Sequence, residues 1–402
     1  RTPGIYNFRL LRLDSCIQSK TINECQCPDK SNSNTIYLRM ILLLILLFAT
    51  VNASDWAVIV AGSSGYWNYR HQAAAASAYH YYLNRGIPKQ QIITFMSETV
   101  ATDELNPFYN QLYSTPGNNT NDKMNGIEIE YGSAEITSTK VLNVLSGNSF
   151  SPKRVLRSSA IDNVYVSFFT YGSPGVLMLP NEALFGSDLM KVIKLMNQKR
   201  LYKELVLYID SDGTDYLFPE FDLDSYHVRL VSPFTEKLTN RNLFCPPNDY
   251  VGEKSIGSCL NTEFSYRLYD GGNSVFHHFQ SKEDPFSNDI VVGQFNLESD
   301  DHEWSVYDTK WEYYVQRRAR NPKDAFLIID IEEEENTRSQ IDRYMRSVLS
   351  VKKAKQNIVK ISEWDCYKRG VKQIEKFFLW NEYTFRYFMV IASICEQDRQ
   401  SF

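Results

Sequence analysis

Apolar runs that end in polar residues are clearest in two stretches near the middle of the chain, 164–175 and 205–218. Each begins with apolar, aromatic and β-branched residues and ends in small and polar ones. Such runs are typical of strands buried in a parallel sheet. In open α/β sheets, sites lie at the carboxyl ends of the strands. The candidate site residues are therefore the polar ones that follow each run: Tyr171, Gly172, Asp210, Asp212 and Asp215.

Shorter patterns on both sides of these stretches predict further elements of the same sheet. Apolar runs predict strands, and helix-like spacing with caps such as Thr137 and stop residues such as Gly147 predicts helices. The predicted strands are 55–61, 91–96 and 226–231, and the predicted helices are 69–85, 136–147 and 182–199. Residues 103–134 are predicted to form a long loop. The alternation of strand and helix predicts an α/β fold, a mostly parallel sheet with helices on both faces.

The composition places few limits on function. The chain has 402 residues, enough for one large domain or two, and 43% of them are hydrophobic, as in ordinary globular proteins. The net charge of -5 gives no indication of a nucleic-acid or anionic-membrane partner. No cofactor is predicted.

The first methionine, Met40, opens an apolar segment that ends in small residues, Val51 and Ala53. Residues 40–53 are therefore predicted to be a signal peptide, since the apolar run is too short to span a membrane. A buried helix or strand is the alternative. Residues 1–39 are interpreted as an upstream leader or a gene-model artefact. The predicted location is the secretory pathway, either secreted or endolysosomal/vacuolar.

The residues after Met40 contain features expected of a secreted protein. Asn118 begins an Asn-x-Thr glycosylation sequon within the predicted loop. Four cysteines in an oxidising compartment suggest two disulfides, with four buried free thiols as the alternative. These cysteines are Cys245, Cys259, Cys366 and Cys395.

The two stretches 164–175 and 205–218 resemble, without a gap, the catalytic segments of the legumains, asparaginyl endopeptidases with a caspase-like fold. The resemblance runs from about Trp56 to Glu396 and is weakest between Leu268 and Asp330. It places Tyr171 at the family's general base, a His, and Asp212 at its nucleophile, a Cys. Both positions are therefore expected to be non-functional.

The resemblance also implies a specificity pocket for asparagine. Arg70 matches the pocket Arg, Asp210 stands at its Glu, and Thr262 stands at its Asp. His71 lies beside Arg70, and Asn68 and Gly172 are expected to support the site. An alternative role for Arg70 is to pair with Asp210 and hold two loops together.

The acidic turn 210–215 resembles a calcium loop only in composition, because it lacks the Gly and Glu that an EF-hand loop requires at its sixth and twelfth positions. A metal site or a carboxylate pair for hydrolysis is thus the less favoured interpretation, and a solvated turn is preferred.

The C-terminal region resembles the death-domain-like, all-α prodomain of legumains, here truncated. The resemblance pairs Cys366 with Cys395 and puts Cys245 and Cys259 in one loop. The predicted domains are a caspase-fold domain over 54–300, a linker resembling an activation peptide over 301–335, and the helical domain over 336–402. This domain is expected to dock over the site, partly through charges: Glu332–Glu335, Arg343, Arg346, Lys352 and Lys353.

Two main functions remain open at this point. The first is an inactive pseudoprotease that acts by binding a peptide or protein ligand or by regulation. The second is an active asparagine-specific cysteine endopeptidase of lysosomal, vacuolar or digestive proteolysis. It requires other residues to substitute, or a Cys codon in place of Asp212 and a His codon in place of Tyr171. An acidic-loop metal-binding protein is a third alternative.

Overall fold

The computed structural model describes most of the chain from Ala53 onward. The described residues are 53–148, 153–211, 214–218, 221–233, 242–271, 309–320, 322–348, 361–378 and 382–397. The leader, almost all of the predicted signal peptide, and Asp212 lie outside these residues, and so does the side chain of Asp215.

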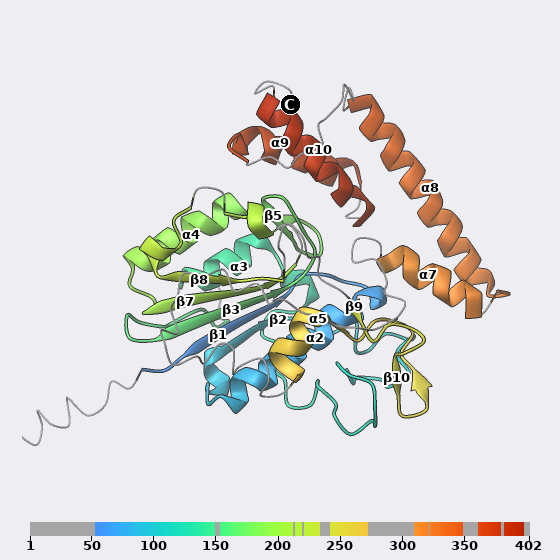
Figure 1. Cartoon of the computed structure of the whole chain (residues 1–402), viewed down its shortest axis with the longest axis horizontal. Coiled ribbons are helices and arrows are strands. Elements are labelled where there is room, and N and C mark those ends of the chain that lie inside the picture. Colours follow the sequence, from blue (N-terminus) through green and yellow to red (C-terminus); the bar gives the residue numbers. More distant parts are fainter. Residues whose placement is uncertain are drawn as a thin grey trace, which may run out of the picture. The chain divides into compact units, whose positions relative to one another are not determined.

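A five-stranded parallel sheet forms the centre of the fold (Figure 1). Its order is β2 (Ile92–Phe95), β1 (Trp56–Ala61), β3 (Asn163–Phe169), β7 (Glu204–Asp210) and β8 (Val228–Val231). All four pairings are parallel, and Ala61 lies beside Phe169, which lies beside Asp210. The residues that follow β1, β3 and β7 therefore meet at one edge of the sheet, as the sequence predicted.

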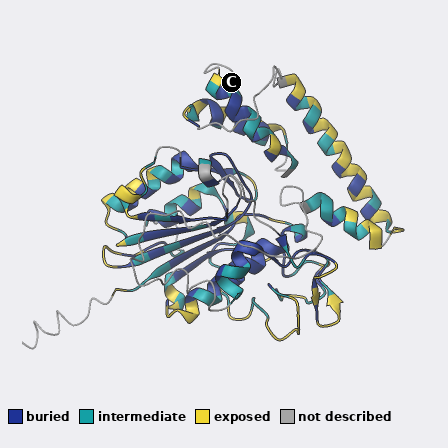
Figure 2. Cartoon of the chain, in the orientation of Figure 1, coloured by how far each residue is buried: buried dark blue, intermediate teal, exposed yellow. Residues whose placement is uncertain are grey.

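Helices cover both faces of the sheet because alternate strand residues point to opposite sides. Val58 and Val60 share a buried cluster with residues of α3 (Ser138–Leu145) and α4 (Gly186–Gln198). Ala57 and Ile59 share another cluster with α2 (Tyr69–Asn84), whose alanines allow close packing. The strands are among the most buried parts of the chain (Figure 2). The predicted α/β fold is confirmed.

The helix predicted over 182–199 begins later than expected. Its first residues form β6 (Ala183–Phe185), which pairs with β5 (Val176–Met178) in a small antiparallel sheet with β4 (Gly172–Ser173). The helix then starts at Gly186, where an added Cβ would lie only 2.0 Å from the Leu217 carbonyl oxygen. Tertiary contact with Leu217 thus requires a glycine at this position.

Smaller elements complete the part before residue 272. They are η1 (Tyr66–Asn68), η2 (Lys89–Gln91), η3 (Ser133–Glu135), η4 (Thr214–Tyr216), η5 (Asp224–Tyr226), β9 (Asn242–Leu243), β10 (Tyr250–Val251), β11 (Lys254–Ser255), β12 (Asn261–Thr262), α5 (Glu263–Ser265) and the π-helical η6 (Tyr266–Asp270). The Thr137 hydroxyl accepts from the Lys140 amide at 3.3 Å, so Thr137 caps α3 as predicted.

The described C-terminal residues are helical. The elements are α7 (Thr309–Arg320), α8 (Ala325–Val348), α9 (Trp364–Phe377), η8 (Glu382–Tyr387) and α10 (Phe388–Gln397). The segment proposed as a linker therefore contains α7 and the first part of α8, and the proposed boundary between residues 335 and 336 falls inside α8. Among the described residues, none of the helices has both the length and the apolar character that crossing a bilayer requires.

The two predicted disulfides are present. Cys245 is bonded to Cys259, and Cys366 is bonded to Cys395. The first bond closes the loop that leads to β12, and the second joins α9 to α10. Both bonds connect segments that local secondary structure alone would leave separate.

Contacts between the C-terminal helices and the sheet domain differ from the predicted charge pairing. Glu332 and Glu333 are exposed, and Glu334 pairs with Lys310 at 2.6 Å and with Arg338 at 3.0 Å. The buried member of the acidic run, Glu334, thus pairs with other C-terminal residues and not with the sheet domain. Arg346 likewise pairs with Asp342 on its own helix, and Lys352 and Lys353 lie outside the described residues.

The C-terminal helices are held against the sheet domain by apolar contacts and by polar contacts of α9. Tyr367 donates to the Pro174 carbonyl at 2.6 Å, and Lys368 pairs with Asp188 at 2.6 Å. Ile341 and Phe388 share a buried cluster with Val176. The prediction of docking through the acidic run is therefore wrong, because the contact combines apolar burial with the Lys368–Asp188 ion pair and the Tyr367–Pro174 hydrogen bond.

Acid does not act uniformly on this contact. Burial raises the pKa of Glu375, which accepts from the Ala183 amide at 2.9 Å, above its ordinary 4.5. The stability it contributes is full below about pH 4.5 and falls as pH rises through the raised pKa. Asp188 behaves oppositely: burial acts against its ionisation, but Lys368 and Lys191 outweigh burial and lower its pKa below 3.8.

Candidate functional site

The loop after β1 lies against β3 and β5 at the carboxyl edge of the sheet. Gly62 donates to the Phe169 carbonyl at 2.9 Å. A Cβ at Gly62 would lie 2.4 Å from the Met178 carbonyl oxygen and 2.5 Å from Thr170 Oγ1. Only glycine allows this approach, which brings the start of α2 next to the end of β3.

Tyr171 is buried at this edge and its polar atom is paired. Its hydroxyl donates to Asn68 Oδ1 at 2.5 Å. Its ring lies 5.2 Å from the Arg70 guanidinium carbon, 5.2 Å from the His71 ring and 5.7 Å from the Phe385 ring. The site therefore brings together four of the residues predicted from the sequence or its resemblance, namely Asn68, Arg70, His71 and Tyr171.

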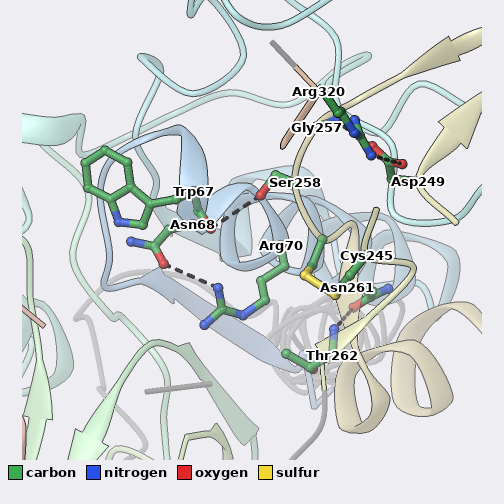
Figure 3. Close-up of a disulfide and its surroundings, with 11 residues drawn as sticks. Trp67, Asn68, Arg70, Cys245, Asp249, Gly257, Ser258, Asn261, Thr262 and Arg320 are labelled. Carbon is green, nitrogen blue, oxygen red and sulfur yellow. Dashed lines mark hydrogen bonds and ion pairs between the residues drawn. A yellow bond between two sulfur atoms is a disulfide. The ribbon is translucent and has the colours of Figure 1, made fainter. Parts of the chain in front are cut away.

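Asn68 connects three parts of the site. Its side-chain amide donates to the Ser64 carbonyl at 2.8 Å, and its Oδ1 accepts from both Tyr171 and Arg70, the latter at 3.3 Å. Figure 3 shows the Arg70 side chain directed toward Asn68. The amide thereby orients the phenol and the guanidinium together.

The alternative in which Arg70 pairs with Asp210 is contradicted. Arg70 is 1% exposed, makes no ion pair within the described part of the chain, and its Nε has no hydrogen-bond partner there. Asp210 instead accepts from Thr262 Oγ1 at 2.5 Å and from Ser265 Oγ. The physical reason is local: Thr262 caps α5 by accepting from the Ser265 amide, and the hydroxyls of both residues then face the Asp210 carboxylate.

Of the three predicted pocket residues, Asp210 and Thr262 are thus in contact, whereas Arg70 is turned toward Tyr171. A guanidinium over an aromatic face is attracted by the ring, by about 2 kcal/mol when both are desolvated. This contact partly offsets the cost of burying the Arg70 charge. Ser265 was missed by sequence analysis, although its position three residues after a capping Thr262 was a usable signal.

His71 is buried and neutral. Its Nδ1 lies 2.6 Å from Ser63 Oγ, and burial, followed by the charge of Arg70, lowers its pKa well below 6.5. A serine hydroxyl beside an imidazole resembles a nucleophile and its base. Gln72 also donates to the Ser63 carbonyl at 3.1 Å, so the pair is part of a network that fixes the loop after β1.

His71 should make the protein sensitive to acid. Because its pKa is depressed in the folded chain, its stabilising contribution is full above pH 6.5 and is lost as pH falls, by up to about 1.4 kcal/mol per unit. His71→Gln should flatten the decline of the melting temperature between pH 7.5 and 5, measured by circular dichroism. His80→Gln, a change on the same helix, is the control; equal slopes in both variants would contradict this role.

Little open space remains beside Tyr171. A cavity of about 60 Å³ is lined by residues of the β1 loop, by Tyr171, and by two C-terminal side chains, Lys310 and Phe385. Ligand pockets commonly measure roughly 300 Å³ or more. While Lys310 and Phe385 stay in place, the described residues therefore leave too little room for a peptide. Neither Lys310 nor Phe385 lies in a local motif that would mark it as a site residue in the sequence.

Other predicted residues have simpler surroundings. Gly172 pairs with Leu177 in the small antiparallel sheet. Asn118 is exposed, and its Oδ1 accepts from the Thr120 hydroxyl at 2.6 Å. Within the described ranges, no three His, Cys, Asp or Glu side chains gather as metal ligands.

These features define an α/β protein of the caspase-like class, with a candidate site at the carboxyl ends of β1, β3 and β7. The peptidase C13 family matches residues 55–282, and the chain belongs to this family, which includes the legumains.

Known relatives agree with this assignment. The chain is 31% identical to hemoglobinase of Schistosoma mansoni over 229 residues, 57% of this chain and 51% of the relative. It is 36% identical to legumain of Rattus norvegicus over 185 residues, 44% and 42% of the two chains. It is 28% identical to vacuolar-processing enzyme of Glycine max over 215 residues, 52% and 43%. The matched region thus spans about half of these relatives or less.

Proposed function

We propose that this chain is a legumain-family protein that lacks the family's cysteine peptidase chemistry and acts by binding a peptide or protein ligand. The observation that carries the proposal is that Tyr171, which stands at the family's His by resemblance, is buried among other side chains. Its hydroxyl is engaged by Asn68, and its ring lies between Arg70, His71 and Phe385.

The chemistry of these groups supports inactivity. A cysteine peptidase needs a thiolate and an imidazole poised near neutral pH. A phenol has a reference pKa of about 10, and an acyl group on the Asp212 carboxylate would be an anhydride with a good leaving group. The remaining imidazole, His71, is buried with its pKa lowered and is a poor base.

The C-terminal helices take the place of a prodomain in this proposal. Phe385 on η8 contacts Tyr171, and Lys310 on α7 lines the cavity beside it. Segments 301–335 and 336–402 would therefore cover the site, as an activation segment and a prodomain do. Without a nucleophile of its own, the chain would stay in one piece unless another protease cut it.

The setting of the protein is also part of the proposal. One relative is named a vacuolar-processing enzyme, and the two disulfides are compatible with an oxidising compartment. We place the protein in the secretory pathway, secreted or endolysosomal, with a signal peptide over 40–53 and a glycan on the exposed Asn118.

A cleavage assay tests the loss of activity. The full chain, incubated at mildly acidic pH with an asparagine-containing fluorogenic peptide, should show no turnover above buffer. Mass spectrometry should show no fragment ending at Asn321 or Asn336; the latter is exposed within α8. Robust cleavage that Asp212→Ala abolishes would establish the alternative function, an active asparagine-specific endopeptidase.

A binding assay tests the second part of the proposal, that the chain binds a peptide ligand. Phe385→Ala removes the ring beside Tyr171 and should strengthen binding of the same peptide, followed by fluorescence anisotropy. Phe377→Ala is the matched control, because Phe377 is 57% exposed and does not line the cavity. Equal affinities in the two variants would argue against a ligand site beneath Phe385.

A further inference from the structure

A second cavity, of about 380 Å³, lies between α7 and the loop closed by the Cys245–Cys259 disulfide. It shares no lining residue with the cavity beside Tyr171. Its volume falls within the roughly 300–1,000 Å³ that small-molecule sites occupy. It therefore has the size of a binding site in its own right.

One wall of this cavity carries two guanidinium groups. Arg317 and Arg320 stand three residues apart on α7, and so on the same face of the helix. Arg317 donates to the Tyr313 hydroxyl at 2.8 Å and Arg320 to Ser255 Oγ at 2.7 Å. A guanidinium has five N–H donors. Each group therefore keeps donors for a carboxylate, the ligand that guanidinium forks bind best.

Two acidic residues limit the charge that this wall presents. Asp324 lies 3.9 Å from Arg317, and Asp249 lies 3.8 Å from Arg320, as Figure 3 shows for the second pair. Both distances exceed that of a hydrogen bond, yet each carboxylate offsets part of a positive charge. A ligand with a single carboxylate fits this balance better than a dianion.

The rest of the cavity is aromatic and acidic. Tyr66 and Tyr313 lie beside the cavity with ring centroids 6.3 Å apart but are almost fully buried, so Leu105, 36% exposed, offers more of the apolar surface that a ligand can reach. Glu104 also lines it, is exposed, and forms no ion pair within the part of the chain that the structure describes. A carboxylate near aromatic rings is a favourable position for an ammonium group.

We propose that this cavity binds a small zwitterion with an apolar side chain, such as an aromatic α-amino acid or a short peptide. The ligand carboxylate would meet Arg317 and Arg320, its ammonium would meet Glu104, and its side chain would pack on Leu105 beside the two tyrosines. This site is separate from the candidate peptide site and does not depend on the chemistry at Tyr171.

Calorimetric titration of the full chain with L-phenylalanine tests this site. N-acetyl-L-phenylalanine, which lacks the ammonium, and L-phenylalaninamide, which lacks the carboxylate, should both bind more weakly. Arg317→Gln should weaken L-phenylalanine binding about tenfold, the typical effect of one charge-assisted hydrogen bond. Arg318→Gln, an exposed neighbour that does not line the cavity, should leave binding unchanged.

Glu104→Gln tests the contact with the ligand ammonium separately from the contact with its carboxylate. Because Glu104 is exposed, this change should not disturb folding. It should weaken binding of L-phenylalanine but leave N-acetyl-L-phenylalanine unchanged, since the latter has no ammonium. Saturable binding with this pattern supports the site. An absence of saturable binding, or equal losses in Arg317→Gln and Arg318→Gln, overturns it. If Arg317→Gln fails to fold, the Glu104→Gln comparison decides alone.

Discussion

The double variant Tyr171→His/Asp212→Cys is expected to cleave an asparagine-containing fluorogenic peptide, whereas the natural chain is expected to leave it intact. The change supplies a thiolate and an imidazole at the positions where legumains carry them. Removing such groups from working peptidases costs roughly 10⁴–10⁶-fold in rate, and binding alone retains the remainder. We therefore expect the double variant to exceed the natural chain by about 10³-fold or more in kcat/KM.

The single variants are the controls for this result. Tyr171→His lacks a nucleophile and Asp212→Cys lacks its base, so each should stay at background. Activity of the double variant should remain below that of legumains, because by resemblance Asp210 and Thr262 replace the Glu and Asp of the family's pocket. Thr262→Asp should not raise it, because this change replaces the hydroxyl that donates to buried Asp210 with a second carboxylate.

Phe385→Ala, added to the double variant, removes the ring that covers Tyr171. A folded triple variant without activity would show that the aligned positions do not form the catalytic pair of this chain. If the natural chain cleaves the peptide as fast as the double variant does, the proposed loss of peptidase activity is contradicted.

Replacing Cys366 and Cys395 together by alanine is expected to destabilise the C-terminal helices by about 3.5 kcal/mol. The disulfide closes a loop of 29 residues between α9 and α10, and the estimate follows from the entropy that the open loop regains on unfolding. Both side chains are buried, so alanine avoids leaving an unpaired hydroxyl.

Urea unfolding, followed by circular dichroism at 222 nm, measures this loss. Cys245→Ala/Cys259→Ala opens a shorter loop, of 14 residues, and should cost about 3 kcal/mol in the sheet domain. Reduction of the natural chain should reproduce both effects. An unchanged unfolding midpoint in the Cys366/Cys395 variant would mean that the apolar cluster around Phe388 holds these helices without the bond.

Local patterns predicted the strands of the central sheet and its main helices, but not the small antiparallel sheet β4–β6 or every helix boundary. The apolar runs at 164–175 and 205–218 became β3 and β7, and Thr137 capped α3 as expected. The start of α4 was misplaced because Ala183–Phe185 pairs with β5, a contact made across a turn. Hydrophobic periodicity and capping are signals that extend over a few residues, whereas strand pairing depends on segments that meet only in the folded chain.

The parallel sheet and the edge at which the candidate residues meet could be predicted from the sequence, and so could the disulfide pairs through the family resemblance. How those residues are used depends on packing in the folded chain. Arg70 is turned to Tyr171 and Asn68, while Asp210 is held by Thr262 and Ser265. Phe385, more than 200 residues from Tyr171 in the chain, covers the phenol. The physical reason is that a buried polar or charged group takes whichever partner the packed chain brings within reach, and no local pattern encodes that choice.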